Sequence, residues 1–118
     1  MYFAVNTSAR MATAPHTQTG ILALQGEIDL HRSSQVKETL DPLVSKKVPR
    51  ILLDFSGVTY IDSSGLATMI EALQRIQGYG GKLAMFGLRD SVRSIFEIAR
   101  LDQIFTIFPD EAAAVAGT

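Results

Sequence analysis

The chain has 118 residues, of which 47% are hydrophobic and 19% are charged, and its formal net charge is -1. This composition is that of one globular domain with a hydrophobic core, not of a disordered chain. The absence of cysteine excludes disulfides and cysteine-ligated metals. The scattered Lys and Arg residues make no basic patch for nucleic acid, and no stretch approaches the ~20 apolar residues of a membrane span.

The N-terminal segment has neither a basic region nor a long apolar run, so we expect no secretory signal and a cytoplasmic protein. The regular hydrophobic pattern begins only after Met11. We therefore expect residues 1–10 to be an N-terminal extension of unassigned structure and residues 11–118 to form the domain.

The first predicted strand is residues 21–28, "ILALQGEI", a short apolar run that ends in Gly and acidic residues. Residues 11–20 are predicted to pair with it as an edge strand, through a turn at Thr19 and Gly20. Pro15 suits an edge strand, because proline cannot donate a backbone hydrogen bond to a neighbour on both sides.

A helix is predicted next, over residues 33–47, where four apolar residues recur at helical spacing: Val36, Leu40, Leu43 and Val44. Pro42 lies inside this pattern and is predicted to kink or divide the helix, since it removes an amide donor. Residues 51–55 then form a second buried strand.

The clearest helix follows, over residues 64–77, with an apolar face formed by Leu66, Met69, Ile70, Leu73 and Ile76. The glycines of residues 78–81 end it. Residues 82–87 are predicted as a strand, 89–100 as an amphipathic helix and 103–108 as a final strand, and Pro109 opens a terminal helix. Because strands alternate with helices, we expect a single α/β domain: a mostly parallel sheet of four or five strands with a mixed edge, and about four helices.

Four polar or small residues lie between the second strand and the clearest helix: Asp62, Ser63, Ser64 and Gly65. These residue types are common at helix starts, where a side-chain oxygen accepts a free backbone N–H, and a capping role alone would explain them. A helix start also tolerates a phosphate, which adds roughly -1.5 to -2 charge. The same residues therefore also suit a phosphorylation switch.

Other kinds of site find less support in the sequence. "GYGGK" follows a helix and lacks the Ser or Thr of a phosphate-binding loop. His16 and His31 lie in different segments and form no metal-ligand pair. No Gly-x-Ser-x-Gly pattern is present, and Asp54 lacks the acidic neighbours of a receiver domain. We expect a binding module, with no catalytic residue, cofactor or metal.

These residues and their surroundings resemble the STAS domain, in particular the stand-alone bacterial anti-sigma-factor antagonist, over roughly Ile21 to Val115. "LQGEID" resembles the family's Gly-Glu-Leu-Asp strand end, and "ILLDFSGVTYIDSSGLATMIEAL" resembles its signature strand, loop and helix. "GGKLAMFGLRDSVRSIFEIARLDQIF" resembles the last third of the family. The family usually has Gly where this chain has Arg100, at a turn where a left-handed conformation is expected.

The resemblance implies a partner-switching protein that controls a sigma factor. Its partner would be an anti-sigma factor that is also a serine kinase with a histidine-kinase-like ATPase fold. That kinase would phosphorylate Ser63, which would release this protein from the kinase, and a PP2C-type phosphatase would remove the phosphate. Ser64 is the alternative acceptor. The expected partner-binding residues are Asp29, Asp62, Ser63, Ser64 and Gly65, without nucleic acid or membrane insertion.

Two alternatives stay open. Asp29 follows a strand, so it either contacts the kinase, as the resemblance implies, or caps the helix that comes next. The whole domain could also be a STAS accessory subunit of a lipid or ABC transport complex, or of a signalling scaffold, in which the serines are never phosphorylated.

Overall fold

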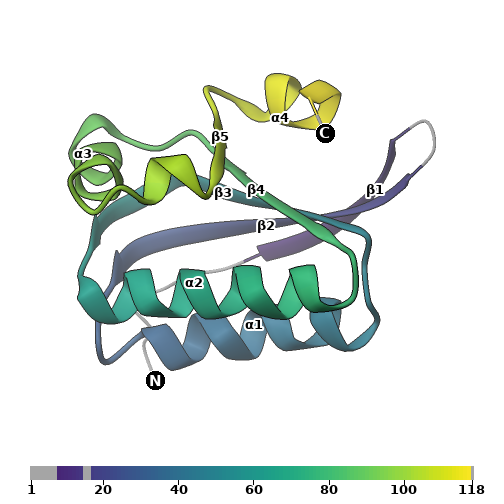
Figure 1. The fold of residues 1–118 in the computed structure, drawn as a ribbon, viewed down its shortest axis with the longest axis horizontal. Coiled ribbons are helices and arrows are strands. Elements are labelled where there is room, and N and C mark those ends of the chain that lie inside the picture. The colour runs from purple at the N-terminus through teal and green to yellow at the C-terminus, as the bar shows by residue number, and fades with distance from the viewer. Residues whose placement is uncertain (1–7, 15–16, 118) are drawn as a thin grey trace.

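The structure is a computed structural model that describes residues 8–14 and 17–117. These residues form one five-stranded sheet in the order β1-β2-β3-β4-β5, in which the last four strands are parallel and β1 is antiparallel to β2 (Figure 1). The strands are β1 Ser8–Ala14, β2 Thr17–Ile28, β3 Arg50–Ile61, β4 Lys82–Phe86 and β5 Thr106–Phe108. The predicted mixed-edge α/β sheet is confirmed.

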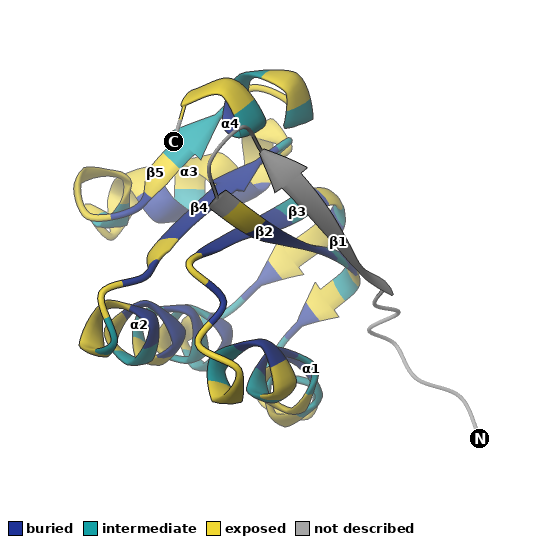
Figure 2. Cartoon of the chain, turned by 90° about the vertical axis from the view of Figure 1, so that its right-hand side faces the viewer, coloured by how far each residue is buried: buried dark blue, intermediate teal, exposed yellow. Residues whose placement is uncertain are grey.

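Three helices connect the parallel strands in chain order, as the alternating pattern predicts, and a fourth follows β5. They are α1 Ser33–Ser45, α2 Ser63–Gly78, α3 Asp90–Ile98 and α4 Glu111–Gly117, with a short 3-10 helix, η1, at Leu101–Gln103. α1 and α2 lie side by side against the sheet (Figure 1). Both turn buried residues inward and exposed ones outward (Figure 2).

The opening hairpin differs from the prediction in the place of its turn and in where its first strand begins. The turn of the opening hairpin does not lie at Thr19 and Gly20: both are inside β2, opposite Ala12 and Met11, because β-branched Thr19 suits extended backbone. β1 and β2 are paired as far as Ala14 opposite Thr17; Pro15, predicted on the edge strand, lies outside the described residues. β1 starts at Ser8, before the expected domain boundary.

α1 is not divided at Pro42. The proline lies in the last turn, so its missing N–H leaves most of the helix unaffected. The final strand is shorter than predicted, because Arg100 takes a left-handed conformation (φ 60°) and η1 occupies the residues that follow. The left-handed turn expected at Arg100 is therefore confirmed.

The core has two parts, one on each face of the sheet. The larger holds the inner faces of α1, α2 and α3, and its centre is Phe96, which makes edge-to-face contacts with Phe55 and Phe105 at ring distances of 6.0 and 5.7 Å. The smaller lies under α4 and includes Leu52 and Phe86. α4 therefore covers the outer face over β3, β4 and β5.

Candidate functional site

β2 and β3 run on together beyond the end of β4. The β3–β4 pairing ends at Asp54 opposite Phe86, whereas β2 and β3 stay paired as far as Ile28 opposite Ile61. The pairing then closes with a hydrogen bond from the backbone N–H of Asp62 to the carbonyl of Ile28, at 3.2 Å. The carboxyl ends of these two strands therefore meet where α2 begins, and such an edge is the usual functional side of a parallel sheet.

Asp62 is the N-cap of α2. Its backbone is extended (φ -106°, ψ -173°), and its Oδ1 accepts the backbone N–H of Gly65 at 3.0 Å. Its carbonyl accepts the N–H of Leu66 at 2.9 Å, which is the first helical hydrogen bond. The capping role expected for an acid at this position is present in the structure.

The two serines differ in exposure. Ser63, the first residue of α2, is exposed, whereas Ser64 is half-buried. The carbonyl of Ser64 accepts the hydroxyl of Thr68 at 3.0 Å, which adds a side-chain bond to the first turn. Of the two hydroxyl-bearing residues, Ser63 is the more accessible to a modifying enzyme.

Gly65 is buried where α2 approaches the strand ends most closely. A Cβ atom there would overlap the carbonyl oxygen of Ile28 and lie 2.6 Å from Cγ1 of Ile61. Close approach of backbone to backbone is thus sufficient to require glycine. A direct partner contact by Gly65 stays a prediction, and its clear role is to place the helix start.

Asp29 lies just past the end of β2 and orders the turn that leads into α1. Its Oδ1 accepts the backbone N–H groups of His31 and Arg32, at 3.0 and 3.2 Å. Its Oδ2 pairs with the Arg32 guanidinium at 2.6 Å, and the same guanidinium reaches Glu27 at 3.4 Å. Of the two alternatives for Asp29, this is close to capping. The N-cap residue of α1 is Arg32, and Asp29 accepts the backbone N–H of that residue instead of being the N-cap itself. A kinase contact by Asp29 stays a prediction.

The remaining candidates form no further site among residues 8–14 and 17–117. Asp54 accepts the backbone N–H and the hydroxyl of Ser56, at 2.9 and 2.7 Å, and so bonds to a near neighbour within β3. His31 is exposed, and His16 lies outside the described residues. No group of three His, Cys, Asp or Glu side chains in the described ranges could hold a metal ion.

Two large apolar side chains near this strand-end site do not follow from the sequence pattern. Leu30, directly after Asp29, is 68% exposed, and Tyr60, two residues before Asp62, is 47% exposed. Tyr60 looks like the end of a buried strand in sequence. Of the two, only the exposure of Leu30 could have been suspected from the sequence, because Leu30 is an apolar residue that fits neither the preceding strand nor the following helical pattern.

The described structure thus combines an ordered helix start at the edge of a mostly parallel sheet with an exposed serine. None of the helices in the described ranges is long and apolar enough to cross a membrane. The family model of the STAS domain matches residues 10–114, and the chain belongs to the STAS domain family. The recognised sequence resemblance is confirmed.

Similar proteins place the chain more closely. The anti-sigma-B factor antagonist of Listeria monocytogenes is 34% identical over 82 residues, which are 70% of this chain and 72% of that protein. The phosphorylated form of the Bacillus cell fate determinant SpoIIAA has the same fold, with a TM-score of 0.66 and 17% identity over 94% of this chain and 100% of that one. Murine solute carrier 26 family member A9, an anion transporter, matches with a TM-score of 0.81 and 14% identity; the match covers 95% of this chain but 22% of the transporter.

Proposed function

We propose that this protein is a cytoplasmic anti-sigma-factor antagonist whose binding is controlled by phosphorylation of Ser63. In the unphosphorylated state it binds an anti-sigma factor that is also a serine kinase of the histidine-kinase-like ATPase fold. Phosphorylation releases it, and a PP2C-type phosphatase restores it. The observation that carries the proposal is the exposure of Ser63, the first residue of α2, beside the Asp62 cap. The similarity to the Listeria antagonist supports it.

The local charge explains how a phosphate could switch binding without unfolding the domain. The surface at the strand ends carries the carboxylates of Glu27, Asp29 and Asp62, and Arg32 offsets one of these three charges. A phosphate on Ser63 would raise the formal negative charge of this surface from two to roughly four. The helix start lowers the cost of the phosphate within the domain, since its backbone N–H groups and dipole favour an anion. A partner surface selected to fit the unmodified site would instead meet repulsion and a larger desolvation cost.

The first test is mass spectrometry of the protein isolated from its own cells, with and without phosphatase treatment. We expect one phosphatase-sensitive phosphate, on the fragment that contains Ser63. Recovery on Ser64 instead would move the acceptor by one residue. If no phosphate were found under several growth conditions, the switch would be rejected.

Binding variants complete the test. Ser63→Ala should bind the kinase even in the presence of magnesium and ATP, whereas Ser63→Glu should bind poorly, because it places a negative charge where the phosphate would be. Ser64→Ala is the matched control and should still be released by phosphorylation. Wild-type binding by both Ser63 variants would contradict the proposal.

A transport-associated role is the second candidate, because the transporter match shows that this fold also occurs in a membrane carrier. That match is one of fold alone. In this case Ser63 would stay unmodified in cells, and genes for transporter subunits rather than for a kinase-like ATPase would lie beside the gene for this protein.

A further inference from the structure

Four large apolar side chains in the described ranges are strongly exposed: Leu30, Tyr60, Ile98 and Ile104. Single exposed apolar residues are ordinary on protein surfaces. Leu30 and Tyr60 differ from ordinary cases in their placement, because each is two residues from one end of the Asp62–Ile28 hydrogen bond. Leu30 lies in the turn that follows β2 and Tyr60 lies in the last part of β3, so both are close in sequence to the strand ends at which α2 and Ser63 begin.

The fold explains why Tyr60 stays uncovered. Its neighbour Ile61 is buried with the helices, so Tyr60 points to the opposite face of the sheet. On that face α4 packs over Leu52 and Phe86, near the start of β3 and on β4. Tyr60 lies beyond β4, on the part of β3 that is paired only with β2.

Leu30 is uncovered for a different reason. The turn that carries it is ordered by Asp29, whose carboxylate accepts two backbone N–H groups and pairs with Arg32. The turn is therefore held in one conformation while its apolar side chain faces solvent. The backbone that carries Leu30 is thus already ordered, so less backbone freedom is lost when a partner binds there, which favours affinity.

We infer that Leu30 and Tyr60 are the apolar anchors through which the anti-sigma kinase binds this domain, an inference that rests on the proposed function. Tyrosine is enriched among the few interface residues that carry most of the binding energy. Glu27 pairs with Tyr60 in the sheet register, and its side chain is 57% exposed. The partner surface should accordingly combine an apolar recess for Leu30 and Tyr60 with cationic groups at its rim. Affinity then comes from the anchors, and the phosphate on Ser63 opposes it.

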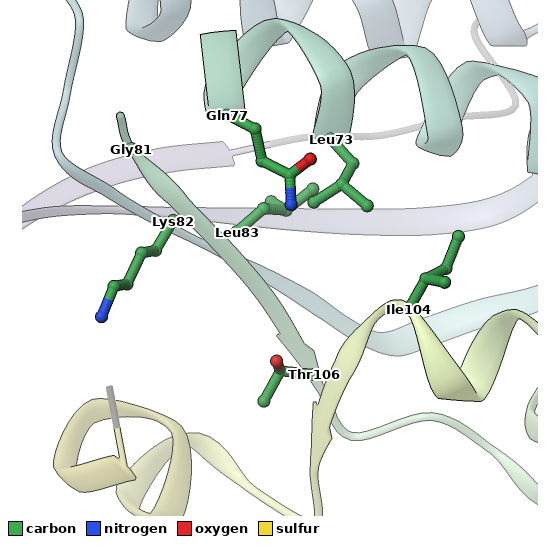
Figure 3. Close-up of a pocket in the computed structure, with 7 residues that line it drawn as sticks. All are labelled: Leu73, Gln77, Gly81, Lys82, Leu83, Ile104 and Thr106. Atoms are coloured by element: carbon green, nitrogen blue, oxygen red, sulfur yellow. The ribbon is translucent and has the colours of Figure 1, made fainter. Parts of the chain in front are cut away.

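Ile104 provides a control of the same chemical kind at another place. It lines a cavity of about 160 Å³ together with residues from the second half of α2 and the start of β4, among them Leu73, Gln77 and Leu83 (Figure 3). Gln77 lies about 21 Å along α2 from Ser63, at 1.5 Å per residue. Ile104 is 51% exposed, close to the value for Tyr60.

The test measures two quantities with the purified cognate kinase: the dissociation constant of the complex without ATP, and the steady-state kinetics of Ser63 phosphorylation. Leu30→Ala and Tyr60→Ala should each raise Kd by about 10- to 30-fold, as is typical for truncation of an important interface residue. Tyr60→Phe should stay within about 3-fold, because it keeps the ring. Ile104→Ala should bind like the wild type.

Kinetics separate docking from chemistry. An anchor variant should lose kcat/KM through a raised KM, with kcat nearly unchanged, because the acceptor serine is intact. Circular dichroism and thermal unfolding verify that each variant is folded, as expected for exposed side chains.

The outcomes distinguish the two proposals. If the wild type is phosphorylated on Ser63 and binds the kinase, but both anchor variants bind equally well, the anchor inference is overturned and the proposed function stands. An equal loss of affinity in Ile104→Ala would also overturn it. If the wild type neither binds nor is phosphorylated, both proposals fail.

Discussion

The substitution Gly65→Ala probes how closely α2 packs against the strand ends. The added methyl group would overlap the carbonyl oxygen of Ile28 and lie 2.6 Å from Cγ1 of Ile61. That carbonyl cannot move freely, because it accepts the backbone N–H of Asp62. Either the helix start must shift, or the ends of β2 and β3 must separate.

The expected change in the free energy of unfolding is the difference between two effects. Alanine is a better helix former than glycine by about 1 kcal/mol, which favours the variant. An extra methyl group in a close-packed region costs about 1–3 kcal/mol, and the upper end applies here, because one of the overlapping atoms belongs to the backbone. Gly65→Ala should therefore lower the free energy of unfolding by about 2 kcal/mol, or the melting temperature by roughly 8 °C.

Gly78→Ala is the matched control, since it makes the same change in the last turn of the same helix. No atom outside the neighbouring backbone of the helix lies within 4 Å of the position that its Cβ would take. Its stability should equal that of the wild type or exceed it by up to about 1 kcal/mol. Urea unfolding followed by far-ultraviolet circular dichroism measures both variants. Wild-type stability of Gly65→Ala would refute the tight packing on which the placement of Ser63 depends.

Three further substitutions test individual contacts by the same unfolding assay. Arg100→Gly should raise the free energy of unfolding by about 1 kcal/mol, because the left-handed backbone at Arg100 (φ 60°) costs a non-glycine residue about 1–2 kcal/mol. An equal gain in Arg100→Ala would show that relief of this backbone strain is not the cause. Asp62→Ala should lower it by about 1 kcal/mol through loss of the cap on the Gly65 N–H, whereas Asp62→Asn should keep most of the stability. Tyr79→Phe should cost about 1 kcal/mol at neutral pH, because it loses the hydrogen bond to the carbonyl of Val48. Burial raises the pKa of the Tyr79 hydroxyl, so as the pH rises the unfolded chain loses the hydroxyl proton before the folded protein does. The free energy of unfolding of the wild type should therefore fall as the pH rises past 10.0. A fall of equal size in Tyr79→Phe would exclude Tyr79 as its cause.

Local patterns predict much of this fold. The apolar face of α2 recurs at helical spacing, and its start follows from Asp62 and its end from the glycines, so all the information lies within one segment. The left-handed turn at Arg100 follows only from the resemblance to the family, because arginine itself gives no local signal for a positive φ. The full length of β3 is not local. Its last residues are extended because β2, far earlier in the chain, continues beside them to Ile28.

The features of the candidate site also divide into those that follow from nearby residues in the sequence and those that depend on distant ones. The capping of α2 by Asp62 is predictable, since cap and target lie three residues apart. The burial of Gly65 depends on Ile28 and Ile61, and sequence alone gives no sign of that contact. The exposure of Tyr60 depends on where β4 ends and where α4 packs. A strand residue can be assigned to a face from its spacing, but its burial requires knowledge of what covers that face.

These contacts also constrain how the proposed switch can act. Ser63 directly follows Asp62, which is bonded to β2 through its N–H and to α2 through both its carboxylate and its carbonyl. Gly65 fixes the same helix turn by close packing. A phosphate on Ser63 would thus be added to a rigid part of the domain and would change its surface charge more than its shape. Control of binding then requires that the partner cover this surface directly, which is why the exposed neighbours Leu30 and Tyr60 matter for the interaction.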